Sequence, residues 1–196
     1  MPAGDAIEVT ARVVAILENL EIPYFVVGSL ASSAHGIPRS TQDIDIVADF
    51  RRCDPTRLAG ALATEFYLDP DRIVDAIEKG GSFNIIHLAT MFKVDLFVLG
   101  SEAPFVEEMN RRVSIAFRDD PDNRLWVASA EDTVVQKLRW YRLGGGISDR
   151  QWQDVIGILR VTSRRGPLDM SYLRRQAAAL GVSDLLEAVL SQAGLA

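Results

Sequence analysis

The alternation of apolar and polar residues in the first part of the chain predicts helices and strands in mixed order. Apolar residues three or four positions apart are typical of a helix, whereas strict alternation is typical of a half-buried strand. Proline and glycine interrupt these patterns and set the ends of the elements. The resulting predictions are a helix over Ala6–Leu20, a strand over Tyr24–Val27, a helix over Leu30–His35, a strand over Asp43–Asp49 and a helix over Asp54–Phe66.

Two further strand-like runs, Phe83–Ala89 and Phe92–Leu99, come later in this part of the chain. Because only Thr90 and Met91 separate them, the sequence predicts a β-hairpin, although these are not the residues that tight hairpin turns favour. The remaining predictions before the chain changes character are a helix over Glu102–Asn110, a strand over Arg112–Phe117 and a polar turn over Asp119–Asn123.

From Ser129 onward the pattern becomes wholly helical. Ser129 followed by Asp132 is similar to a capping box at the start of a helix, with Asp in place of the usual Glu. Helices are predicted at roughly 130–143, 148–162, 169–180 and 183–193, separated by glycine or proline. We therefore predict an α+β fold, with a mixed β-sheet flanked by helices in residues 1–128 and a helical bundle in residues 129–196.

Composition and charge exclude several classes of protein. The 196 residues carry a net charge of −6, and all of this excess lies in residues 1–118. An acidic front half argues against broad DNA binding, because phosphate contacts need a basic face. The N-terminus has neither the basic nor the apolar region of a signal peptide, and no apolar run is long enough to span a bilayer. We expect a cytoplasmic protein without a membrane partner.

The candidate chemistry begins with Asp43 and Asp45 on the predicted strand. Side chains alternate along a strand, so both carboxylates project from one face while Ile44 and Ile46 project from the other. Two such carboxylates repel each other unless the surface is open or a divalent cation neutralises both. Mg²⁺ prefers carboxylate oxygens and substrate phosphates, so the pair is a candidate Mg²⁺ site. The alternative is a solvated edge of the sheet.

A second candidate lies upstream, where an apolar strand ends in Gly28-Ser29 and a helix follows. The backbone N–H groups at the start of a helix attract anions, and a glycine lets a phosphate come close. Arg39 is placed to reach the same phosphates, unless it is a surface charge only. The stretch has neither the Gly-Lys-Ser/Thr of a Walker A loop nor the spacing of a Rossmann fingerprint.

Asp95 is the third candidate carboxylate. It is a charged residue in the strongly apolar strand Phe92–Leu99, where it needs a partner or a cation. If this strand lies beside the strand of Asp43 and Asp45, three carboxylates converge, which suits a two-metal displacement. The alternative is a structural ion pair between Asp95 and Lys93 or an arginine.

These residues together resemble a known family. Gly28-Ser29, a spacer with Arg39 and Thr41, Asp43-x-Asp45 and a later Asp95 look like the nucleotidyltransferase superfamily of the DNA polymerase beta type. More narrowly, the chain is similar to bacterial AbiEii-type toxins and minimal nucleotidyltransferases. The later segment with Lys137 and Asp154 is similar to the helical part of that group. The resemblance covers about Tyr24–Leu159.

The resemblance implies transfer of a nucleotidyl group from a nucleoside triphosphate (NTP) to an acceptor hydroxyl on RNA, such as tRNA, or on protein. It implies Mg²⁺, with Mn²⁺ as an alternative, and a helical region that completes the cleft. A cognate toxin or antitoxin is an implied partner. The residue roles that it implies are metal binding by Asp43, Asp45 and Asp95, catalysis by these three and Lys137, phosphate binding by Gly28, Ser29, Arg39 and Thr41, and support of Lys137 by Asp154.

Two alternatives stay open at this point. The chain could keep the fold and the nucleotide but lack turnover, and act as a module that binds a partner protein. Lys137 and Asp154 could tie two helices together without any part in chemistry, because amphipathic helices often carry such pairs.

Overall fold

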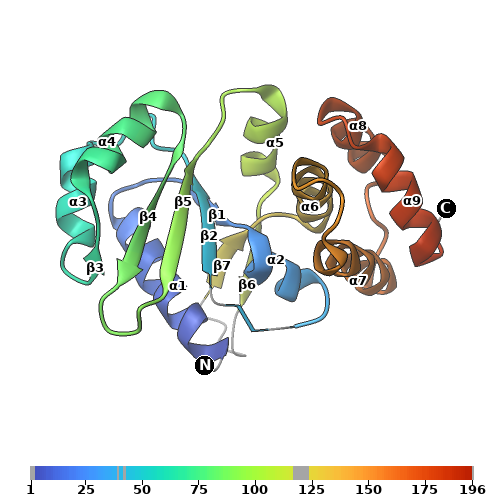
Figure 1. Cartoon of the computed structure of the whole chain (residues 1–196), viewed down its shortest axis with the longest axis horizontal. Helices are drawn as coiled ribbons and strands as arrows, with labels where there is room; N and C mark the ends of the chain where they lie inside the picture. The colour runs from blue at the N-terminus through green and yellow to red at the C-terminus, as the bar shows by residue number, and fades with distance from the viewer. Residues whose placement is uncertain (1–2, 39, 42, 117–123, 196) are drawn as a thin grey trace. The chain divides into compact units, whose positions relative to one another are not determined.

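The computed structural model describes residues 3–38, 40–41, 43–116 and 124–195. Its elements are a mixture of helices and strands up to residue 127 and are helical afterwards (Figure 1). In chain order they are α1 (Ala3–Asn19), β1 (Tyr24–Val26), α2 (Gly28–His35), β2 (Asp43–Ala48), α3 (Pro55–Leu62), β3 (Phe66–Tyr67), α4 (Pro70–Lys79), β4 (Ser82–His87), β5 (Lys93–Val98), α5 (Ala103–Arg111), β6 (Val113–Ala116), β7 (Arg124–Val127), α6 (Ala130–Leu143), α7 (Asp149–Arg165), α8 (Met170–Ala179) and α9 (Ser183–Ala193).

The strands form one mixed sheet in the order β3-β4-β5-β2-β1-β7-β6. β2 pairs with β5 in parallel and with β1 in antiparallel orientation, so β2 lies in the middle of the sheet. β1 also pairs in parallel with β7 through Val26 and Val127. The α+β fold with a mixed sheet is therefore confirmed.

Contacts divide the chain into two compact units. The first unit is Met1–Leu30 with Arg39–Val127, and it holds the sheet. The second is Ala31–Pro38 with Ala128–Ala196, so the boundary falls within α2. The segment Ala31–Pro38 is bound to the helical unit by His35, whose Nε2 lies 2.7 Å from the carbonyl oxygen of Ala128.

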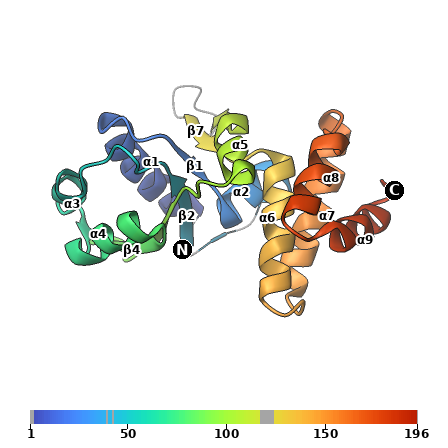
Figure 2. The same cartoon turned by 90° about the horizontal axis from the view of Figure 1, so that it is seen from above.

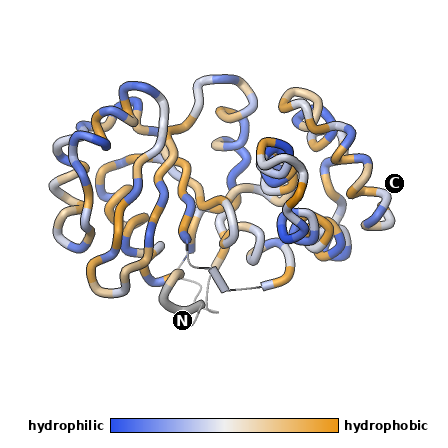
Figure 3. Tube along the Cα trace, viewed as in Figure 1, coloured by the Kyte–Doolittle hydropathy of each residue, from blue (hydrophilic) through white to orange (hydrophobic). Residues whose placement is uncertain are grey.

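The core of the first unit lies on the apolar side of the central strands. α1 packs against β2 and α3, and α4 packs against α3 and β4. Figure 3 shows hydrophobic colour along much of these strands. The buried side chains that β2 and β5 contribute are Ile44, Ile46, Ala48, Val94 and Leu96, each with no exposed surface. Each fully buried Val, Leu or Ile contributes about 1.5–3 kcal/mol, so this face fixes the register of both strands.

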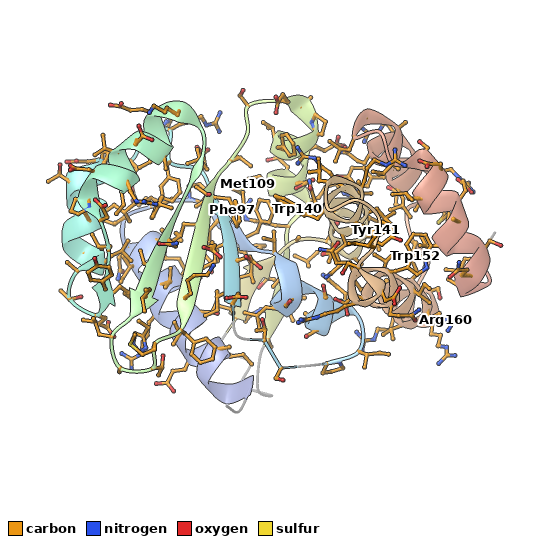
Figure 4. All side chains as sticks on the ribbon, viewed as in Figure 1. Phe97, Met109, Trp140, Tyr141, Trp152 and Arg160 are labelled. Atoms are coloured by element: carbon orange, nitrogen blue, oxygen red, sulfur yellow. The ribbon has the colours of Figure 1, made fainter. Side chains whose placement is uncertain are left out.

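The second unit is a bundle of α6, α7, α8 and α9. α6 and α7 lie side by side in both views (Figures 1 and 2), and α9 packs against α7. The rings of Tyr141 and Trp152 meet between α6 and α7, with centroids 5.1 Å apart (Figure 4). Arg160 then joins α7 to α9 by donating a hydrogen bond of 2.7 Å to the carbonyl of Gln192.

A buried polar network supports the start of α6. The Asp132 carboxylate accepts hydrogen bonds from Ser129 Oγ at 2.6 Å and from Tyr172 of α8 at 2.5 Å. Ser129 Oγ in turn accepts from the backbone N–H of Asp132 at 3.1 Å. The predicted N-cap at Ser129 is thus confirmed, and each Asp132 oxygen has a donor, which a buried carboxylate requires. Among the helices that the structure describes, none is long and apolar enough to cross a membrane.

Several sequence-based boundaries need correction. The predicted helix Asp54–Phe66 ends at Leu62. Phe66 lies in β3 instead, where it pairs with His87 of β4. The hairpin of β4 and β5 is confirmed, but its connection runs from Leu88 to Phe92 rather than over two residues. Met91 adopts a φ of 60° there, and its N–H donates to the carbonyl of His87.

Three elements were missed by the sequence analysis: β3, α4 and β7. α4 carries a clear signal, because Asp69-Pro70 repeats the cap-and-proline start of α3 at Asp54-Pro55. β3 and β7 are too short for a repeating pattern, and only their pairing partners define them.

Replacing the α4 cap tests this account of the fold. The Asp69 side chain accepts from the backbone N–H groups of Asp71 and Arg72. We expect Asp69→Ala to lower the free energy of unfolding by about 1 kcal/mol, the usual value of an N-cap. Glu78→Ala near the end of the same helix should be neutral or slightly stabilising, because it removes a negative charge from the negative end of the helix dipole. Urea unfolding of both variants measures the difference, and equal losses would contradict the cap.

Candidate active site

The candidate site is built on the pairing of β2 with β5. In this parallel pair Asp45 is the register partner of Asp95, and Asp43 is the partner of Lys93. Side chains of register partners project from the same face of a sheet, and alternation puts positions two apart on that face as well. The strands therefore place all three aspartates on the face opposite to Ile44 and Ile46.

Asp45 lies against the start of α2. Gly28 begins that helix with a φ of 64°, and a methyl group added to its Cα would lie 2.0 Å from Oδ2 of Asp45. No side chain can occupy that space while the carboxylate stays where it is. The two halves of the motif, Gly28-Ser29 and Asp45, are thus brought together, and this contact explains why a glycine stands at this position.

Thr41 positions the first residue of β2. Its hydroxyl donates to the carbonyl of Asp43 at 2.8 Å and lies 3.3 Å from the backbone nitrogen of the same residue. These bonds order the backbone just before the exposed Asp43 side chain. Phosphate binding by Thr41, as the resemblance implies, stays a prediction. Arg39 lies outside the described residues.

Asp95 forms an ion pair with Lys93. The Nζ of Lys93 lies 2.8 Å from Oδ2 of Asp95, with 43% of the lysine side chain and 22% of the aspartate side chain exposed. The sequence analysis named this ion pair as the alternative to metal binding by Asp95.

The charges around Lys93 show how the carboxylates are grouped. Its hydrogen bond to Asp95 raises the pKa of the Lys93 ammonium, against a smaller opposing effect of burial. The negative charges of Asp95, Asp43 and Asp45 also raise this pKa. One ammonium therefore interacts with all three carboxylates, although it touches only one of them.

The donor set has the chemistry of a magnesium site, since three carboxylates face one cation. Lys93 is in contact with one of them, Asp95, and lies where a divalent ion would be attracted. Within the described ranges, however, no three or more acidic, histidine or cysteine side chains lie close enough together to hold a metal in this arrangement. Metal binding by Asp43, Asp45 and Asp95 therefore stays a prediction.

Lys137 and Asp154 form a second ion pair, in the helical unit. Nζ of Lys137 in α6 lies 2.8 Å from Oδ2 of Asp154 in α7, and the side chains are only 11% and 14% exposed. The expected support of Lys137 by Asp154 is thus present as a contact. The same contact also fits the alternative that the pair ties two helices together, because a shielded ion pair between neighbouring helices fixes their register whatever its chemistry.

Lys93 is the site residue that sequence reasoning undervalued. The signal was its position two residues before Asp95, which puts both side chains on one face of a strand. Asn84 of β4, the register partner of Asp95, is a further polar residue beside the site. It gave no signal in the sequence, because only the pairing of β4 with β5 brings it there.

Comparisons with solved structures identify the fold. The chain is similar to ANT(2″)-Ia in complex with adenylyl-2″-tobramycin, with a TM-score of 0.58 and 13% identity over 89% of this chain and 96% of that chain. An antigenic nucleotidyltransferase-like protein from Paracoccidioides brasiliensis has a TM-score of 0.58 and 17% identity over 96% and 92% of the two chains. A provisionally assigned nucleotidyltransferase from Thermotoga maritima has a TM-score of 0.53 and 15% identity over 79% and 96%.

These likenesses show that the chain has the nucleotidyltransferase fold. The identities are too low to carry activity or substrate from those proteins to this one. No protein-family model matches the sequence, and no curated protein matches it.

The contact between Gly28 and Asp45 makes a prediction about stability. Gly28→Ala should lower the free energy of unfolding by more than the roughly 1–2 kcal/mol that left-handed backbone costs an alanine, because the new methyl group also meets Asp45. Gly80→Ala is the matched control, since Gly80 has a φ of 71° and its methyl group would meet nothing within 4 Å. Urea unfolding of both variants, and of Gly28→Ala with Asp45→Ala, measures the contact. A Gly28→Ala loss no larger than the Gly80→Ala loss would exclude it.

The Lys137–Asp154 pair predicts a second difference in stability. Removing one member of a buried ion pair takes a charge partner from the other member, so Asp154→Asn should lower the free energy of unfolding by about 3–5 kcal/mol. Adding Lys137→Met should recover much of this loss. Glu187→Gln is the control, because the pair of Arg174 and Glu187 in the same unit is about half exposed. Exposed pairs contribute about 0–1 kcal/mol, so Glu187→Gln should cost much less than Asp154→Asn in thermal unfolding. Similar losses for the two variants would show that burial does not make the Lys137–Asp154 pair more stabilising.

Proposed function

We propose that this protein is a metal-dependent nucleotidyltransferase, which moves a nucleotidyl group from an NTP to an acceptor hydroxyl. The observation that carries the proposal is the register of β2 and β5, which pairs Asp45 with Asp95 beside Gly28 at the start of α2. Carboxylates on adjacent parallel strands, next to a helix start that can face an anion, are what a metal–triphosphate site needs.

Asp43, Asp45 and Asp95 would hold Mg²⁺, or Mn²⁺ in its place. When bound, the metal would neutralise charge on the triphosphate and lower the pKa of the acceptor hydroxyl. The chain's own contribution is the fixed spacing of the carboxylates, which the strand backbones and the Thr41–Asp43 bonds set before any substrate arrives.

The triphosphate would lie at the start of α2. Gly28 has no side chain, so a phosphate can approach the backbone there, and the N–H groups of the first helical turn attract negative charge. Ser29 would add a hydroxyl donor, and Arg39 would add a positive charge. The role that the resemblance gives to Lys137, which is to offset charge that develops in the transition state, is part of this proposal.

In the reaction, the acceptor oxygen would attack the α-phosphorus, and the bond from that phosphorus to the β-phosphate oxygen would break. Pyrophosphate would leave with the electron pair of that bond. The Asp95 carboxylate would take the acceptor proton, since a carboxylate within hydrogen-bond reach is a competent general base.

The acceptor is proposed as a hydroxyl of tRNA or of a protein, in line with the likeness to AbiEii-type toxins. A toxin that modifies tRNA and an antitoxin that modifies its cognate toxin are both consistent with this chemistry. The fold likeness to ANT(2″)-Ia, whose complex holds adenylyl-2″-tobramycin, adds an aminoglycoside hydroxyl as a third acceptor to test. A partner-binding module without turnover is the competing function.

The proposal predicts label transfer that depends on Asp95. Purified protein is incubated with Mg²⁺, each of the four α-³²P-labelled NTPs and an acceptor: bulk tRNA, total cell protein or tobramycin. We expect one acceptor class to become labelled, with release of pyrophosphate. Asp95→Asn should lower the rate by at least about a hundredfold, the lower range for a general base.

Controls separate the proposed function from its competitor. Asp75→Asn, on the exposed face of α4, should leave the label transfer unchanged. Lys137→Met should lower the turnover number while changing NTP affinity less, because its charge is needed most in the transition state. NTP and Mg²⁺ that raise the melting temperature without any transfer would favour the silent module. No shift in melting temperature and no transfer, with any NTP, would contradict both.

A further inference from the structure

The position of Lys93 gives it a role beyond pairing with one aspartate. It opens β5 two residues before Asp95 and stands opposite Asp43 in the register of β2. Lys93 and the three aspartates therefore share one face of two adjacent strands. Its ammonium bonds to Asp95 at 2.8 Å, and nearly half of the lysine side chain stays exposed. Its four-carbon stem can thus turn into solvent without disturbing the core.

The three carboxylates repel one another, so a positive charge nearby stabilises them. Like charges held on neighbouring strands repel, and the strand register prevents them from moving apart. Among the contacts that the structure describes, Lys93 brings a positive charge to this group through its ion pair with Asp95. A single ammonium offsets only part of this negative charge, so a divalent cation is attracted to the same place more strongly.

The ammonium and a divalent cation cannot both use Asp95 in the present arrangement. An Oδ2 that bonds Lys93 at 2.8 Å keeps a positive charge within ion-pair distance of any metal on the same carboxylate. Two cations that close repel strongly in a partly buried site. Either the lysine leaves or the metal binds weakly.

We infer that Lys93 is a built-in counter-cation that holds Asp95 when no metal is present, and that metal must displace it from this carboxylate. The inference rests on the proposed function, because it assumes that a divalent metal uses Asp95. Lys93 is on this account a positioning residue: it keeps Asp95 ordered before the metal arrives, and it sets how tightly the metal binds.

The competition is measured as the Mn²⁺ affinity of the 196-residue protein, without nucleotide, by electron paramagnetic resonance of the free ion. Lys93→Met removes the competitor, so Mn²⁺ should bind at least about fivefold more tightly, the lower limit for coupling between two binding events. Lys93→Arg keeps the charge and should stay within about twofold of the wild type. Lys79→Met, which removes the exposed pair with Asp75 on α4, is the matched control and should not change the affinity.

A second measurement uses the wild-type protein, in which the Lys93 side chain is present. In the wild type, Mg²⁺ is titrated while the lysine side-chain ¹⁵N resonances are followed, and the Lys93 signal is assigned by its absence from Lys93→Arg. Displacement from Asp95 should shift or broaden that signal at the same Mg²⁺ concentrations that saturate the site. In EDTA, Lys93→Met should melt at a lower temperature than Lys79→Met, because Asp95 then loses the ammonium that it pairs with.

The possible results separate this inference from the proposed function. Mn²⁺ binding to the wild type with unchanged affinity in Lys93→Met, or a Lys93 signal that Mg²⁺ does not move, would overturn the inference and leave the metal site standing. No binding of Mn²⁺ to any variant would overturn both. Tighter binding by Lys93→Met together with an absence of nucleotidyl transfer would support the inference and overturn only the proposed reaction.

Discussion

The parallel pairing of β2 with β5 is the constraint on which the rest of the candidate site depends. It puts Asp45 beside Asp95 and Asp43 beside Lys93, and the buried residues Ile44, Ile46, Val94 and Leu96 on the opposite face lock that register. A slip of one residue would move every one of these side chains to the wrong face. The apolar core therefore holds the acidic face in place. Burial of these apolar side chains offsets the repulsion between the aspartates.

Two features accommodate the negative charge on this face: the space beside Gly28 and the ammonium of Lys93. Asp45 occupies the space that a side chain at position 28 would need, so Gly28 and Asp45 form one structural unit. Lys93 supplies positive charge from the same strand as Asp95. In the proposed function, a bound cation would replace a charge that Lys93 already supplies to Asp95, which would limit the rearrangement that binding requires.

The helical unit shows the same preference for paired polar groups within an apolar interior. Asp132 is buried but has donors from Ser129 and Tyr172, and Lys137 and Asp154 shield each other between α6 and α7. Such groups are tolerated only when they are satisfied. They also help to fix which helix faces meet, because a buried charge needs specific polar partners whereas an apolar side chain can pack against many neighbours.

The sequence by itself determined the elements with a repeating pattern, the caps at Asp54 and Ser129, and the face shared by Asp43 and Asp45, because these depend on residues close together in the chain. It also held the signal for α4, which the pattern analysis passed over, and it named Lys93 only as a possible ion-pair partner of Asp95. Only the tertiary structure decided that β5 lies beside β2, that Asp45 contacts Gly28, that Asn84 adjoins Asp95, and that Ala31–Pro38 groups with the helical unit. Strand order and register arise from burial across the whole sheet, and no local pattern encodes which strands become neighbours.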